Sequence, residues 1–123
     1  MMEQYVDGFV IVLPKKNVKA YQKMSAKAGK VWMEYGALQY VECAGDDLKT
    51  MKEITSFPEL GKSKKDETVI FSFIVYKSKQ QRDEVNKKVM TDKRILKAMK
   101  DPMLFEMKKM TYGGFKTIVN YKR

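Results

Sequence analysis

Hydrophobic residues follow two different periods along the first third of the chain. Residues 5–13 are rich in β-branched and aromatic side chains and end at Pro14, a pattern that predicts a strand. Hydrophobic positions then recur every three or four residues over 18–35, which predicts an amphipathic helix. Gly36 follows, where glycine most easily takes the left-handed conformation that ends a helix. Residues 37–43 alternate between apolar and polar and predict a second strand.

A polar segment separates these elements from the next strand. Residues 45–67 predict a long loop, with a short irregular strand near residues 54–57. Residues 69–76 and 110–119 predict the third and fourth strands.

Two helices are expected between those strands. Ser78, followed three residues later by Gln81, forms a capping-box pattern that predicts a helix to about Met90. Asp92 is placed to cap a second, short helix that ends before Pro102.

The order of elements is therefore strand, helix, strand, strand, helix, strand. Two βαβ halves in this order predict an α+β fold, the ferredoxin-like βαββαβ sandwich, with both main helices on one face of a four-stranded antiparallel sheet. We expect one domain over residues 1–123, with a core at 5–119 and a basic tail at 120–123.

The two central strands are apolar on both sides, which is unusual for a sheet with one face open to water. The first strand has Phe9, Ile11 and Leu13 on one side and Val6, Val10 and Val12 on the other, and the third has Val69, Phe71, Phe73 and Val75 opposite Ile70, Ile74 and Tyr76, so the face without helices is apolar. Soluble monomers seldom expose so large an apolar patch, so we expect a second copy to cover it. The sequence thus predicts a homodimer through the helix-free sheet face. The alternative is a monomer whose core absorbs these residues.

Composition limits the chemistry. The chain of 123 residues has one Cys, no His and a net charge of +10. One Cys excludes an internal disulfide, and the absence of His removes the commonest general base and metal ligand. No apolar run is long enough to cross a membrane, and the first residues lack the apolar region of a secretory signal, so a cytoplasmic protein without a membrane partner is expected.

The positive charge raises the question of a nucleic-acid partner. Residues 69–100 carry +6 and residues 101–123 carry +3. No run of five like charges and no RNA-binding aromatic signature accompanies them, so a solvated surface is favoured over nucleic acid. Nucleotide-binding glycine loops, nucleophile elbows and cysteine zinc patterns are also missing, and we expect no cofactor and no metal.

Four residues are candidates for acid–base catalysis. Asp7 is an acid inside an otherwise apolar strand, where it serves either as a base in a cavity or as a carboxylate satisfied by a neighbour. Glu42 lies on the second strand, and Tyr40 and Tyr112 offer phenolic donors. Cys43 lacks a His partner that would make it a nucleophile.

A second set of residues is expected to bind a ligand rather than to react. Its members combine aromatic rings on the first helix, a glycine pair in the last strand, and two polar side chains four residues apart on the second helix. They are Trp32, Tyr35, Gly113, Gly114, Arg82 and Asn86. The alternatives are that the rings are core, that the glycines make room for another ring, and that the polar pair belongs to a surface network.

Eight short blocks in order along residues 5–119 carry a family resemblance. They are Tyr5-Val6-Asp7-Gly8-Phe9, Ala28-Gly29-Lys30-Val31-Trp32, Tyr40-Val41-Glu42-Cys43, Gly45-Asp46-Asp47, Thr55-Ser56-Phe57-Pro58, Asp66-Glu67-Thr68-Val69, Arg82-Asp83-Glu84-Val85-Asn86 and Tyr112-Gly113-Gly114-Phe115. Together they resemble the YbaA-like bacterial family of uncharacterised function. The resemblance implies a ferredoxin-like subunit of a dimeric α/β barrel and no established activity.

Dimeric α/β barrels include cofactor-free oxygenases, haem-degrading enzymes and ligand-binding proteins, so the fold alone does not decide the function. We expect a homodimer that binds a small apolar or aromatic molecule, with an oxygenase-like reaction without a cofactor as one form of it. The alternatives are an RNA-binding basic protein and an interaction module with no ligand.

Overall fold

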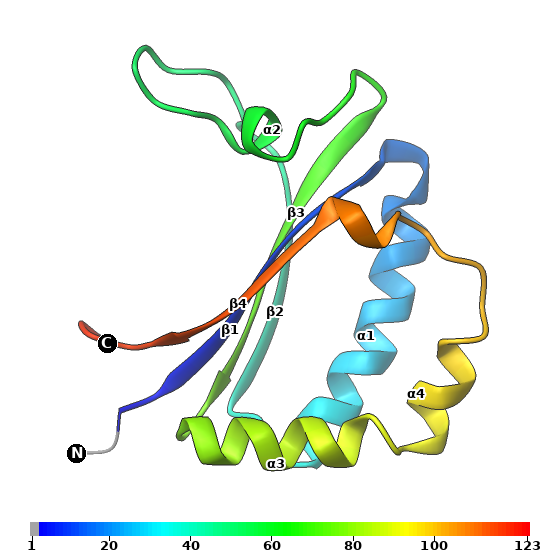
Figure 1. Cartoon of the computed structure of the whole chain (residues 1–123), viewed down its shortest axis with the longest axis vertical. Helices are drawn as coiled ribbons and strands as arrows, with labels where there is room; N and C mark the ends of the chain where they lie inside the picture. The colour runs from blue at the N-terminus through cyan, green and yellow to red at the C-terminus, as the bar shows by residue number, and fades with distance from the viewer. Residues whose placement is uncertain (1–2) are drawn as a thin grey trace.

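Four antiparallel strands form one sheet in the computed structural model, which describes residues 3–123 (Figure 1). The strands are β1 (Tyr5–Pro14), β2 (Gln39–Ala44), β3 (Glu67–Tyr76) and β4 (Met110–Lys116). Their order across the sheet is β2-β3-β1-β4. This is the strand order of the ferredoxin-like sandwich, and the predicted α+β fold is confirmed at that level.

Helix α1 (Val18–Glu34) follows β1 after the short 3₁₀ turn η1 (Lys15–Asn17). Its buried residues are Tyr21, Ser25, Gly29 and Val31. Gly36 has a φ of +116°, a conformation that favours glycine, and the chain turns there toward β2 as predicted.

Helices α3 (Lys79–Val89) and α4 (Lys93–Ala98) begin at the predicted caps. Ser78 Oγ accepts from the backbone N–H of Gln81 at 3.1 Å, and an Asp92 carboxylate oxygen accepts from the backbone N–H of Arg94 at 2.8 Å. The second half of the predicted capping box differs: Gln81 Oε1 accepts from the backbone N–H of Lys77, not from that of Ser78.

The segment between β2 and β3 contains a helix where a strand was predicted. Helix α2 (Phe57–Leu60) starts at Ser56, whose hydroxyl accepts from the backbone N–H of Glu59, while the Glu59 carboxylate accepts from the backbone N–H of Ser56. This complete capping box favours a helical turn, so the expectation of a strand near residues 54–57 is wrong. The only strand-like contact between residues 51 and 57 is an isolated bridge from Met51 to Ile54.

The fourth strand is shorter than predicted. It ends at Lys116 rather than at Val119, because Lys116 pairs with Tyr5, the first residue of β1. One further backbone hydrogen bond, from Thr117 N–H to the Gln4 carbonyl at 3.1 Å, continues past that point.

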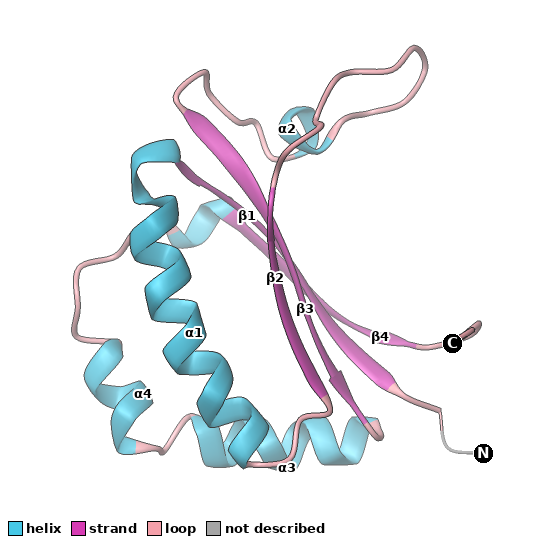
Figure 2. Ribbon diagram, turned by 180° about the vertical axis from the view of Figure 1, so that it is seen from behind, coloured by secondary structure: helices cyan, strands magenta, loops and turns pink. Residues whose placement is uncertain are grey.

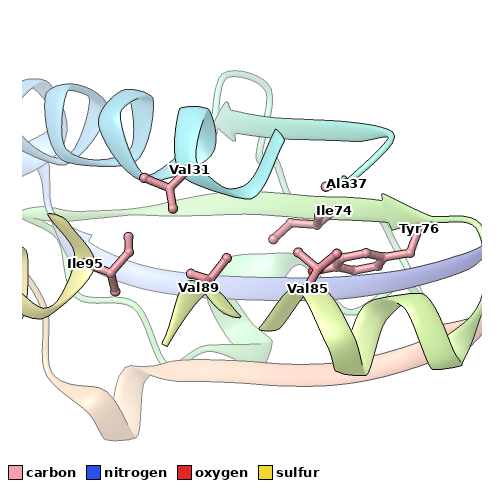
Figure 3. Packing of buried hydrophobic residues seen from close by; sticks show 7 residues of the cluster. All are labelled: Val31, Ala37, Ile74, Tyr76, Val85, Val89 and Ile95. Atoms are coloured by element: carbon pink, nitrogen blue, oxygen red, sulfur yellow. The ribbon is translucent and has the colours of Figure 1, made fainter. Parts of the chain in front are cut away.

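The hydrophobic core lies between the sheet and α1, α3 and α4, which share one side of it (Figures 1 and 2). One cluster joins these helices to β3, as Figure 3 shows; it consists of Val31, Ala37, Ile74, Tyr76, Val85, Val89 and Ile95. A second cluster lies nearer the other end of α1 and consists of Ile11, Leu13, Tyr21 and Ile70. No helix within residues 3–123 is both long and apolar enough to cross a membrane.

On the opposite side of the sheet, the only helix within residues 3–123 is the short α2, which with its loop reaches over one end (Figure 1). We call this side the helix-free face; its apolar members are Val6, Val10, Val12, Val41, Val69, Phe71, Phe73, Val75 and Phe115. Val12 and Val69 are buried at the end near α2, whereas Phe71 is 45% and Phe115 60% exposed. Away from α2, this face is therefore partly exposed in a single chain.

Candidate functional site

A cavity of about 510 Å³ lies between α1 and the helix-bearing side of the sheet. Side chains from all four strands, from α1 and α3, and from the segment before the 3₁₀ turn η2 (Met107–Lys109) line it. We call it the α1–sheet cavity. Its volume is within the range of small-molecule sites, roughly 300–1,000 Å³.

The strand register sets the floor of the α1–sheet cavity, because alternate residues of a strand point to the same side. Two neighbouring rows of paired residues cross the sheet there. They are Glu42–Ser72–Phe9–Tyr112 and Tyr40–Ile74–Asp7–Gly114. Polar groups therefore lie toward both edges of the floor, with apolar Phe9 and Ile74 between them. Three strand spacings of ~4.8 Å separate the backbones at the two edges.

The first polar cluster is centred on Asp7, which is 1% exposed. Asp7 Oδ1 accepts from Arg82 Nη1 at 2.7 Å and from the Tyr112 hydroxyl at 3.2 Å. Arg82 Nη1 also donates to the Tyr112 hydroxyl at 2.7 Å, and its Nε donates to Asp83 at 2.8 Å. Burial, reinforced by the negative charge of Asp7, raises the pKa of Tyr112. The buried carboxylate is thus satisfied by an ion pair and a phenol.

Gly114 makes this ion pair sterically feasible. It pairs with Asp7 across the sheet, and a Cβ at Gly114 would lie 2.5 Å from the Tyr5 hydroxyl and 3.0 Å from Arg82 Nη1. The guanidinium of Arg82 lies over the ring of Tyr5, 4.9 Å from its centroid. The missing side chain therefore leaves the space through which Arg82 reaches Asp7.

Gly113 lies on the other side of the sheet. It pairs with Gly8, and ideal Cβ atoms at the two glycines would lie 3.4 Å and 3.3 Å from the ring of Phe115. The notch that the two glycines form is occupied by this ring on the helix-free face. Of the predicted glycine pair, only Gly114 is near the α1–sheet cavity.

The second polar cluster is centred on Glu42. Its Oε1 accepts from the Tyr21 hydroxyl at 2.9 Å, and its Oε2 accepts from the Tyr40 hydroxyl at 3.0 Å. Burial raises the pKa of Glu42, although hydrogen bonds from Tyr21, Tyr40 and Ser72 act in the opposite direction. Burial, followed by the charge of Glu42, also raises the pKa of both tyrosines. Glu42 is therefore a carboxyl group that holds its proton more strongly than an exposed glutamate.

Asn86 connects three elements at one end of the cavity. Its Oδ1 accepts from Trp32 Nε1 and from the Tyr76 hydroxyl, both at 3.1 Å. Trp32 in turn lies 5.9 Å from Tyr40, measured between ring centroids. Asn86 and Arg82, four residues apart on α3, thus each contact one part of the site.

Tyr35 and Cys43 lie outside the cavity. The Tyr35 hydroxyl donates to Asp92 at 2.8 Å, next to α4. Cys43 is exposed and shares the helix-free side of β2 with Val41. Within residues 3–123, the side chains of Glu42, Cys43, Asp46 and Asp47 do not gather into a set that could hold a metal ion.

Tyr21 and Gly29 were not among the predicted site residues. Tyr21 belongs to the hydrophobic stripe of α1, and nothing in the local sequence links it to Glu42. Gly29 did carry a signal, because a glycine inside a long helix costs stability unless something packs closely against it. A Cβ at Gly29 would lie 2.6 Å from the ring of Tyr40.

Comparison with known proteins gives a family and a fold. The family described as "Protein of unknown function (DUF1428)" matches residues 4–107. The chain is 43% identical over 117 residues to the uncharacterized protein YbaA of Escherichia coli K12, covering 95% of this chain and 98% of that protein. The YbaA protein of Shigella flexneri matches with the same identity and coverage. The resemblance found in the sequence is confirmed.

Two solved structures share the architecture. One is a dimeric ferredoxin-like protein from an uncultured marine organism, with a TM-score of 0.60, 8% identity, and coverage of 97% of this chain and 99% of that one. The other is a nipsnap family protein of unknown function from Agrobacterium tumefaciens, with a TM-score of 0.57, 16% identity, and coverage of 94% and 89%. At these identities the likeness shows the fold alone.

Proposed function

The chain belongs to the DUF1428 family of proteins of unknown function, and we propose that it is a homodimer that binds a small aromatic or apolar molecule in the α1–sheet cavity. The observation that carries this proposal is the cavity itself. It combines aromatic and aliphatic walls with two separate clusters of hydrogen-bonded polar groups, around Asp7 and around Glu42. Apolar walls supply affinity and a few fixed polar groups supply orientation.

Two of the side chains that line the cavity are partly exposed, so a ligand can reach the cavity from solvent. Met24 of α1 and Met90 after α3 line the cavity and are 38% and 46% exposed. Methionine side chains are unbranched and flexible, so they adapt to ligands of different shape.

Acid–base catalysis is a second candidate function, and the raised pKa of Glu42 favours it. Glu42 would transfer a proton to or from the bound molecule, with the Tyr40 hydroxyl beside it. Asp7 and Tyr112, toward the β4 edge of the sheet, form a second hydrogen-bonded pair of a carboxyl group and a phenol. An oxygenase-like reaction without a cofactor would use these same groups.

The dimer is proposed through the helix-free face. Its exposed aromatic residues, Phe71 and Phe115, lie on β3 and β4, and a two-fold axis would bury them against the same face of the second copy. A solved ferredoxin-like structure of similar fold is described as dimeric, which supports a homodimer here. Burial of such a surface contributes ~25 cal/mol per Å², before the cost of association.

Ligand binding can be measured with the neutral fluorescent probe N-phenyl-1-naphthylamine. Trp32 is the single tryptophan of the chain and lines the cavity, so energy transfer from it to the probe reports occupancy. Ala28 of α1 also lines the cavity, and Ala28→Phe should fill the space and weaken probe binding by at least about tenfold.

Ala26→Phe on the exposed side of the same helix is the matched control and should leave probe affinity unchanged. Equal affinity of the wild-type protein and the Ala28→Phe variant would place the probe elsewhere and contradict the proposed site. No saturable binding of this probe, or of smaller aromatic molecules detected by chemical-shift changes around Trp32, would contradict the proposed function itself.

A further inference from the structure

Two carboxylates face the α1–sheet cavity, and only Asp7 has a cationic partner. Its Oδ1 lies 2.7 Å from Arg82 Nη1. Glu42, in contrast, forms no salt bridge with any Lys or Arg among residues 3–123. It is held by the hydroxyls of Tyr21 and Tyr40. Ser72 is a third side-chain donor to Glu42, so three of the roughly four acceptor sites of the carboxylate are used and one is left for a ligand.

Aromatic rings form the surroundings of this carboxylate. Tyr40 lies beside Trp32, with ring centroids 5.9 Å apart, and Tyr21 lies edge-on to Phe105, with centroids 6.2 Å apart. The faces of such rings attract organic cations. Although the chain carries a net charge of +10, no Lys or Arg of the described residues lines the cavity. The interior thus differs in charge from the surface.

We propose that the α1–sheet cavity selects a protonated aromatic amine, whose ammonium group pairs with Glu42 and whose ring lies against Trp32 and Tyr40. This inference rests on the proposed function and names the class of ligand. A buried ammonium needs both an opposite charge and hydrogen-bond acceptors. Glu42 supplies both in its ionised form, which the positive charge of the bound ammonium favours against the effect of burial. Asp7 does not compete for the ammonium, because Arg82 and Tyr112 already bond it.

The test compares two ligands of nearly equal shape. Phenethylamine is protonated at neutral pH, and propylbenzene replaces its ammonium group by a methyl group. Both are titrated against the wild-type protein and against Glu42→Gln, which keeps the size of the side chain and removes its charge. Trp32 fluorescence and displacement of N-phenyl-1-naphthylamine report binding. Glu34→Gln, at an exposed position of α1, is the matched control.

We expect the wild-type protein to prefer phenethylamine by at least about tenfold, and Glu42→Gln to lose that preference while its propylbenzene affinity is retained. Retained propylbenzene binding also shows that the variant is folded. Equal or weaker binding of the amine to the wild-type protein, or a preference that survives Glu42→Gln, would overturn the inference and leave the proposed cavity function standing. Failure of both ligands to bind would overturn both.

Discussion

At the scale of single residues, Gly29 shows how the ring beneath a helix determines which side chain the helix can carry. Glycine inside a helix costs about 1 kcal/mol relative to alanine. A Cβ at Gly29 would nevertheless lie 2.6 Å from Cδ1 and 2.7 Å from Cε1 of the Tyr40 ring. That ring is fixed by its hydrogen bond to Glu42 and its contact with Trp32, so it cannot easily move aside.

We therefore expect Gly29→Ala to destabilise the protein by about 1–3 kcal/mol, although alanine has a higher helix propensity than glycine. Urea unfolding followed by circular dichroism measures the change. Ala26→Gly, at an exposed position of the same helix, calibrates propensity alone and should cost about 1 kcal/mol. A Gly29→Ala protein more stable than the wild type would show that Tyr40 moves without cost.

The carboxyl group of Glu42 should make stability depend on pH. Because burial raises its pKa above the ordinary 4.5, the folded state binds the proton more strongly than the unfolded state does. The contribution of Glu42 is therefore most favourable below about pH 4.5 and is lost as pH rises through the raised pKa.

This dependence is measured as the difference in unfolding free energy between the wild-type protein and Glu42→Gln. We expect the stability of the wild-type protein relative to Glu42→Gln to fall as pH rises from about 4.5 through the raised pKa of Glu42. Gln80→Ala, on the exposed surface of α3, removes no titratable group and should show no comparable trend. A difference that moves in favour of the wild type over this range would mean that the folded state favours the charged form of Glu42.

Sequence reasoning named both acids of the cavity, and also Arg82, Tyr40 and Tyr112, but not which of these residues bonds which acid. Asp7 and Glu42 were recognisable because each is an acid within an apolar or alternating strand. The partner of Asp7 is Arg82, 75 residues away, and Glu42 is joined to Tyr21 on α1. Such contacts depend on strand register and on where a helix crosses the sheet, which local patterns do not contain.

At the scale of elements, Gln81 joins the end of α1 to the start of α3. Its Nε2 donates to the Gly36 carbonyl at 2.8 Å, and its Oε1 accepts from the backbone N–H of Lys77 at 2.6 Å. The same helix carries Arg82 and Asn86 to the two parts of the site. The position of α3 is thus fixed at a residue that does not itself face the cavity.

Gln81→Ala should destabilise the protein by about 1–3 kcal/mol, because it leaves two backbone groups without their partner. It should also weaken probe binding, since Arg82 and Asn86 move with α3. The neighbouring Gln80→Ala is the control: Gln80 makes one long hydrogen bond to Glu84 on the exposed surface, and its loss should cost under about 0.5 kcal/mol. Equal losses from the two variants would argue against this role for Gln81.

The elements themselves were largely predictable, and the errors have local causes. The starts of α3 and α4 followed from Ser78 and Asp92, because a capping side chain binds within its own turn. The helix that begins at Phe57 was predictable in the same way, because Ser56 is followed three residues later by Glu59, the pattern of a capping box. The end of β4 was not predictable locally, because it depends on where the partner strand β1 begins.

At the scale of the whole molecule, one face of the sheet is proposed to bind a ligand and the other to bind a second subunit. The α1–sheet cavity occupies one face, and the proposed dimer contact occupies the helix-free face. Along β3 the two roles alternate: Ser72 and Ile74 line the cavity, whereas Phe71 and Phe73 point the other way. Because the strand separates the two surfaces, ligand binding should not require the second subunit.

Phe71→Glu tests this separation. Phe71 is 45% exposed in the single chain, so the monomer should tolerate a charge there, whereas an apolar interface should not. We therefore expect the dissociation constant of the dimer to rise by at least about tenfold. Light scattering during size-exclusion chromatography measures the mass. Leu96→Glu on α4, 46% exposed on the helix side, is the matched control and should stay dimeric. The monomeric Phe71→Glu protein should bind N-phenyl-1-naphthylamine as the wild type does. A loss of probe binding would mean that the partner subunit shapes the cavity through β3. A wild-type protein that is already monomeric would contradict the proposed dimer.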